Sequence, residues 1–290
     1  MNFDLLRNME SFTQTMFNNI ISFQEKEHLA WNQSLAFADR IKNLPLHYLV
    51  FSNADRDPEK CGPTIAHYYP LRRELQTIAE YCKKTSKIPV VIDAHARNGF
   101  IGSLLAREGL NVIGLRDNED KPNQITHFFD ENCYNMRDIN LSQIDFPVDV
   151  IFSSWMPNGT DITDDIIRLK PKLIVYIYTE HTNNQETVIN QTGVEGAFGE
   201  NLPDNYQEID HWEITRKENM FSDIWPDLTP NIEEIRKVKI IADQAFHDLK
   251  IKPSEPDHKY DWENDLLMIE TAIEAKNQLR LRGLPVDAMQ

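Results

Sequence analysis

Cysteine is scarce in this chain, and that scarcity excludes two classes of architecture. The 290 residues contain only Cys61, Cys82 and Cys133, which are too few and too scattered for a disulfide framework or a cysteine-based zinc site. The nine histidines show no metal-ligand spacing such as His-Glu-x-x-His. We therefore predict a protein without a structural metal, in a reducing compartment.

Long hydrophobic runs are also missing. No apolar run approaches the roughly 20 residues that a membrane-spanning helix needs. The first residues lack the basic-then-apolar order of a secretory signal. These two absences predict a globular protein of the cytoplasm that does not interact with membranes.

Basic residues are outnumbered, with 30 Lys and Arg against 46 Asp and Glu and a formal net charge of -16. This balance argues against a protein that holds long nucleic acid through its phosphates. The short basic runs 168–172 and 236–239 are interpreted as solvated helix faces. A small molecule or a protein segment is therefore the expected substrate.

The most informative segment covers residues 90–102, where an apolar strand ends in Asp93 and a tight loop leads into a helix. A second short apolar run follows at residues 112–115, with Asp117 just past its end. Strand, loop, helix, strand and carboxylate in this order are typical of a nucleotide-type site in a doubly wound α/β sheet.

Residues 93–99 and 112–117 resemble the first two motifs of class I S-adenosylmethionine-dependent methyltransferases. The family pattern is Asp/Glu-x-Gly-x-Gly-x-Gly, and its glycine positions fall on His95, Arg97 and Gly99. In the family, the glycines let the backbone pass close under the methionine part of the cofactor. His95 and Arg97 must therefore point away from the cofactor or block its pocket.

The resemblance assigns the rest of a cofactor site. It implies that Asp93 holds the loop or the amino end of S-adenosylmethionine, that Asp117 binds the ribose, and that Asp138 contacts the adenine amine. The family usually has the ribose-binding acid two residues after Gly114, where this chain has Arg116.

A fourth strand is expected within residues 148–154, and its Ser153 is a further cofactor-binding candidate. The exit loop 155–158 is similar to a Trp-Pro-Pro-x loop of methyltransferase-like proteins. A fifth strand, 173–178, leads to Glu180 and His181 at the same sheet edge. As candidate catalytic residues, Trp155 and Glu180 would face the methyl acceptor, and His181 would accept its proton.

Three regions are expected: a helical extension at 1–64, a methyltransferase-like domain at 65–230, and a helical extension at 231–290. Residues 12–35 and 231–250 are expected to be helical, and 209–216 to be an antiparallel edge strand. Tyr69 lies in the segment that closes over the cofactor in the family. The glycine-containing stretch 183–207 is a second candidate cover.

The helix expected at 261–281 has one apolar stripe, which packs on the amino-terminal helices or forms a homodimer. Its residues are Trp262, Leu266, Ile269 and Ile273.

The resulting fold prediction is a doubly wound, mostly parallel α/β sheet with helical extensions at both ends. The expected function is methyl transfer from S-adenosylmethionine to a small-molecule or protein acceptor. The first alternative is a cofactor-free interaction protein in which His95 and Arg97 fill the pocket. A nicotinamide-dependent oxidoreductase is the weaker alternative, because the chain has no Gly-x-Gly-x-x-Gly.

Overall fold

The computed structural model describes residues 29, 32–42, 66, 68, 70, 72–116, 126–182, 188–190, 192–194, 196–199, 202–217 and 233–251. The expected helix at 261–281 and its apolar stripe lie outside these residues, as do Asp117, Tyr69 and most of the amino-terminal extension. Of the expected helix at 12–35, the described end (32–35) forms a turn that precedes the short helix α3, Phe37–Lys42.

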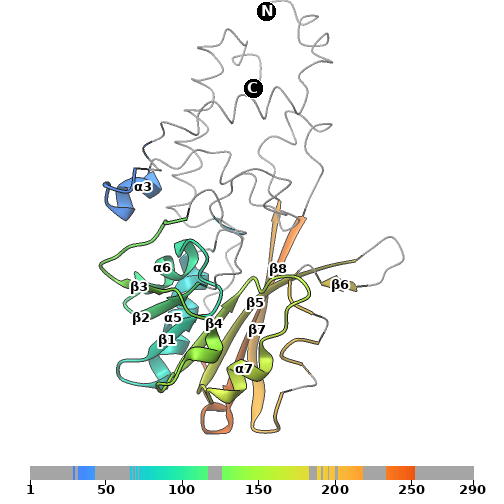
Figure 1. Ribbon diagram of the computed structural model, residues 1–290. Helices are drawn as coiled ribbons and strands as arrows, with labels where there is room; N and C mark the ends of the chain where they lie inside the picture. The colour runs from blue at the N-terminus through green and yellow to red at the C-terminus, as the bar shows by residue number, and fades with distance from the viewer. Residues whose placement is uncertain are drawn as a thin grey trace, which may run out of the picture.

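One mixed sheet organises the described chain, with the strand order β3-β2-β1-β4-β5-β8-β7 (Figure 1). Strands β3, β2, β1, β4 and β5 are parallel neighbours, whereas β8 runs antiparallel to both β5 and β7. The short β6 pairs with β5 off this path. The bounds are β1 Val90–Asp93, β2 Asn111–Leu115, β3 Tyr134–Arg137, β4 Val150–Ser154, β5 Leu173–Thr182, β6 Val188–Asn190, β7 Tyr206–Lys217 and β8 Glu233–Asp243.

Helices cover both faces of the sheet. Helices α5 (Arg72–Thr85) and α6 (Phe100–Ala106) pack on one face, and α7 (Thr163–Arg168) and the 3-10 turn η2 (Leu141–Gln143) pack on the other. The central strands are apolar on both faces, as expected for a parallel sheet that is covered twice. Val91 and Ile92, for example, are adjacent and fully buried, and they belong to opposite cores.

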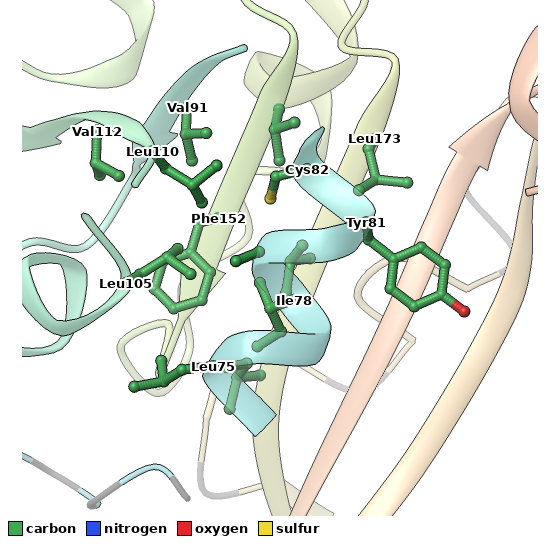
Figure 2. Packing of buried hydrophobic residues seen from close by; sticks show 14 of the residues in the cluster. Leu75, Ile78, Tyr81, Cys82, Val91, Leu105, Leu110, Val112, Phe152 and Leu173 are labelled. Atoms are coloured by element: carbon green, nitrogen blue, oxygen red, sulfur yellow. The ribbon is translucent and has the colours of Figure 1, made fainter. Parts of the chain in front are cut away.

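Helix α5 presents its apolar stripe to buried residues of β1, β4 and β5, as Figure 2 shows. Leu75, Ile78 and Cys82 lie on this stripe at a spacing of three to four residues, so one helix face covers the sheet. Tyr81 extends to one side, where its hydroxyl donates to Asp210 on β7 over 2.6 Å.

The expectation of a helix at 231–250 is wrong over most of its length. Residues 233–243 form β8, a long strand inserted between β5 and β7, and a 3-10 turn follows. Residues 236, 238, 240 and 242 point into the core, whereas Lys237 and Lys239 are partly exposed. The basic run 236–239 is therefore one strand with an inward-facing Arg236, and the sheet extends beyond residue 230.

Strand β7 lies at the sheet edge, as the sequence predicted for residues 209–216, and a bulge between Glu208 and Asp210 interrupts its register with β8. The strand that runs against the parallel set is β8. Strand β5 is longer than expected, so Glu180 and His181 lie within it and pair with Asn190 and Ile189 of β6. Among the described helices, none is long and apolar enough to cross a membrane.

Candidate functional site

The strand order reverses between β1 and β4, because the chain continues outward from β1 through β2 to β3 and then returns to β4 on the other side of β1. Ligands of open α/β sheets bind outside the carboxyl ends of the strands at such a switch point. Here that position is bounded by the loop 94–99 after β1 and the loop 155–160 after β4.

Two residues of the first loop have left-handed backbone conformations. Gly99, which precedes α6, has φ 85°, and Arg97 has φ 51°. Arg97 occupies a position where the family pattern has glycine, so its backbone keeps the glycine-like conformation although it carries a long side chain. A non-glycine residue held there is strained by about 1–2 kcal/mol, and such strain is typical of functional sites.

The Arg97 side chain connects the two loops. Its Nη2 donates to the backbone oxygen of Trp155 over 3.2 Å. Trp155 also has a left-handed backbone, with φ 58°, and its N–H donates to the carbonyl of Ile177 on β5 over 2.9 Å. Arg97 therefore spans the space between the loops.

Nε2 of His95, in the first loop, and Oγ of Ser153, near the end of β4, are buried at this edge without a hydrogen-bond partner in the described part of the chain. Buried polar atoms are nearly always paired, so each unpaired one calls for a structural explanation such as a bound group.

Burial, together with the positive charge of Arg97, lowers the pKa of His95 to about 3. The folded protein therefore holds His95 neutral, whereas unfolding restores its ordinary pKa near 6.5. The stability that depends on a neutral His95 is present above the unfolded pKa and is lost as pH falls toward 3.

We expect the urea midpoint of wild type to fall more than that of His95→Gln between about pH 7 and about pH 4, because only wild type carries the buried imidazole. Equal falls of the two midpoints would contradict a neutral, buried His95.

Asp93 lies below this edge, on the face that α6 covers. It is 2% exposed, and Oδ2 accepts a hydrogen bond from the Tyr134 hydroxyl over 2.8 Å. Burial and the negative charge of Asp93 raise the pKa of Tyr134, which keeps its hydroxyl protonated. Gly102 and Gly114 leave the room that this pair needs, because a side chain at either position would overlap it.

The residues expected to bind adenosine are arranged differently from the family pattern. Asp138, just after β3, forms an ion pair with Arg116, with 2.7 Å between Oδ1 and Nη2. Arg116 also donates to the carbonyl of Thr126 over 3.2 Å. The guanidinium of Arg116 therefore lies where the family usually has the ribose-binding acid. It also forms an ion pair with Asp138, the carboxylate that was expected to contact adenine.

Trp155 is packed into the protein. It is 5% exposed, and its ring stacks on Tyr68 with 5.0 Å between centroids. The Tyr68 hydroxyl and Oγ of Ser154 share a hydrogen bond of 2.8 Å. The Trp155 indole therefore forms a buried wall beside the switch point, and the main-chain carbonyl of Trp155 accepts a hydrogen bond from Arg97.

The segment after β6 packs against the exit loop of β4. Gly193 donates to the carbonyl of Met156 over 2.9 Å and accepts from the N–H of Gly159 over 2.8 Å. Its left-handed backbone, φ 61°, lets it pass close to Tyr176. Part of the stretch 183–207, which was expected to cover the site, lies outside the described residues, and that expectation stays a prediction. The backbones of Glu180 and His181 lie in the part of β5 that pairs with β6.

Residues 126–130 cross the outer end of the first loop, which the sequence did not predict. The backbone N–H of Phe128 donates to the carbonyl of Asn98 over 2.8 Å, and the backbone N–H of Asp130 donates to Oγ of Ser103 over 2.7 Å. Phe129 lies where a side chain at Gly99 would project. Helix α3 holds this segment through Arg40, which donates to the carbonyl of His127 over 2.6 Å.

Sequence reasoning also missed Tyr68, Tyr134, Glu74 and Arg236. The alternation of polar and apolar residues at 237–240 is the sequence signal of a strand that could have placed Arg236 on the inward face. Within the described ranges, no three His, Cys, Asp or Glu side chains gather as a metal site would require.

Comparison with known proteins adds structural likeness without sequence kinship. No family model matches the chain, and no curated protein matches it. Among solved structures, it resembles Burkholderia thailandensis 1,6-didemethyltoxoflavin-N1-methyltransferase with bound S-adenosylhomocysteine, at 12% identity and a TM-score of 0.38, over 58% of this chain and 77% of that one. It also resembles TehB from Haemophilus influenzae, at 13% identity and a TM-score of 0.40, over 58% of this chain and 62% of that one.

The Bacillus YcgJ protein gives 11% identity and a TM-score of 0.39, over 59% of this chain and 97% of that one. Likeness at this level carries no argument about activity. The strand order and the helices on both faces rest on the chain's own structure. This mixed, mostly parallel sheet between helices confirms the predicted doubly wound α/β architecture.

Proposed function

We propose that this chain binds S-adenosylmethionine at the carboxyl edge of β1 and β4 and transfers its methyl group to a small-molecule or protein acceptor. The observation that carries the proposal is the pair of buried, unpaired polar atoms at the switch point, His95 Nε2 and Ser153 Oγ. A ligand at this point would supply the partners that the described protein atoms do not.

The residues at this edge fit the amino-acid end of the cofactor. That end carries an ammonium group and a carboxylate, and the edge offers a neutral imidazole, a hydroxyl and the Arg97 guanidinium. Arg97 and Gly99, at two of the three glycine positions of the family pattern, both have left-handed backbones, the conformation that favours glycine. The ribose end departs from the pattern, because Arg116 replaces the usual acid and Asp117 lies outside the described residues.

When bound, the cofactor supplies an electrophilic methyl group on a sulfonium. The chain then needs to position the acceptor and to exclude water. The stacked rings of Trp155 and Tyr68 provide a dry wall beside the edge. Glu180 and His181 are our proposed residues for orienting the acceptor and taking up its proton.

Calorimetric titration with S-adenosylmethionine and S-adenosylhomocysteine tests the proposal. We expect wild type to bind in the micromolar range and Ser153→Ala to bind about threefold to tenfold more weakly, because the variant loses one hydrogen bond. Ser142→Ala, at an exposed serine of η2 whose hydroxyl donates to Asn140, is the matched control. Equal affinities of Ser153→Ala and wild type would contradict the role of Ser153, and no heat with either ligand would contradict cofactor binding.

The hydrogen bond from Arg97 to the carbonyl of Trp155 favours a second candidate, a cofactor-free interaction protein. In this case the two side chains at glycine positions fill the pocket. The double variant His95→Gly and Arg97→Gly separates the candidates. Binding that appears only in the double variant supports the interaction protein, whereas binding present in wild type and lost in the variant supports the enzyme.

A further inference from the structure

A buried ion pair lies beside the candidate site. Arg236 of β8 and Glu74 of α5 both have side chains that are 1% exposed. Two contacts join them, Nη2 to Oε2 at 2.7 Å and Nε to Oε1 at 3.2 Å. This bidentate geometry fixes the plane of the guanidinium and its distance from the helix.

Tyr68 connects this pair to the exit loop of β4. The guanidinium carbon of Arg236 lies 4.5 Å from the centre of the Tyr68 ring, as in a cation–π contact. The same tyrosine, 1% exposed, stacks on Trp155 and shares its hydroxyl hydrogen bond with Ser154. Its ring therefore contacts the ion pair and the wall of the site at the same time.

Stability alone gives a poor explanation for this arrangement. Well-packed apolar residues that replace a buried ion pair are often equally stable, because burial removes the hydration of both charges. What an ion pair does supply is a fixed geometry. Here the pair contacts Tyr68, and Tyr68 in turn stacks on Trp155. The left-handed backbone of Trp155 must be held in place by its surroundings.

We propose that Tyr68 is a positioning residue of the site: the buried Glu74–Arg236 pair orients its ring, and the ring and hydroxyl hold Trp155 and Ser154 in place. This inference deepens the proposed function, since it concerns how the same edge is built. Its first readout, the indole of Trp155, does not depend on any ligand.

The test uses Tyr68→Leu, Tyr68→Phe and the double variant Glu74→Leu with Arg236→Met. Trp155 emission is obtained as the difference between each protein and its counterpart carrying Trp155→Phe. We expect a red shift in Tyr68→Leu and in the double variant. For both we expect S-adenosylhomocysteine to bind at least tenfold more weakly. In Tyr68→Phe the stack remains, and exchange of the Trp155 amide should rise about threefold to tenfold.

Leu173→Ala is the control for simple destabilisation. Leu173 is fully buried in the same core but lies at the opposite end of β5, so its variant should lose stability and keep both the emission and the affinity. If Tyr68→Leu does not fold, the other two variants decide. Unchanged Trp155 emission in the double variant would overturn the proposal. Altered emission without any binding by wild type would uphold it and refute the proposed function.

Discussion

Replacing Arg236 by methionine should lower the free energy of unfolding by about 3–5 kcal/mol, because the buried carboxylate of Glu74 would lose the bidentate ion pair that compensates its charge. Urea denaturation monitored by far-ultraviolet circular dichroism measures the change. The size of the effect follows from the depth of the pair, since both side chains are 1% exposed. An exposed pair such as Lys83 and Glu80 contributes at most about 1 kcal/mol.

The double variant Glu74→Leu with Arg236→Met is the matched comparison. It removes both charges at once, so most of the lost stability should return. A single variant that unfolds at the same urea concentration as wild type would show that Glu74 finds water or another partner. A double variant as unstable as the single one would show that the packing of the pair matters more than its charges.

Gly102→Ala should destabilise the protein by about 1–3 kcal/mol, although alanine is normally the better helix former. A methyl group on Gly102 would overlap Oδ2 of Asp93 and the ring of Tyr134. Relief requires the two side chains to move apart, which breaks the hydrogen bond that satisfies a buried carboxylate. The expected loss exceeds the helix-propensity gain of at most about 1 kcal/mol.

Gly109→Ala provides the contrast, because no described atom lies near a methyl group at that position. Its cost should come from its left-handed backbone alone, about 1–2 kcal/mol. The free energies of unfolding of both variants are compared by urea titration. If Gly102→Ala is as stable as wild type, the packing of α6 on Asp93 is looser than the structure indicates.

The sequence carried enough information for the centre of the fold. Short apolar runs, each followed by a polar loop, correctly placed β1, β2, β4 and the start of β5. The position of Gly99 before a helix was also predictable, because a left-handed residue at this point favours glycine. These features are local, so neighbouring residues suffice to indicate them.

The wrong and missing parts depend on distant contacts. Lys237, Lys239 and Arg236 suggest a solvated surface until the partner of Arg236 is known, and that partner is 162 residues away in Glu74. Arg116 and Asp138 each looked like separate features of a motif, whereas the fold pairs them. Strand pairing and ion pairing across the sheet leave little trace in a single sequence.

The outer strand β7 has a consequence for association between copies of the protein. Among the described strands it pairs with β8 alone, so its other side has main-chain groups that another strand would recognise. The bulge near Ile209 bends this side, and Glu208 and Glu213 form ion pairs with Lys239 and Lys237 of β8, which places charged side chains along the edge. A bulge and charged side chains on an edge strand discourage another strand from pairing with it, so they guard β7 against fibril-like stacking.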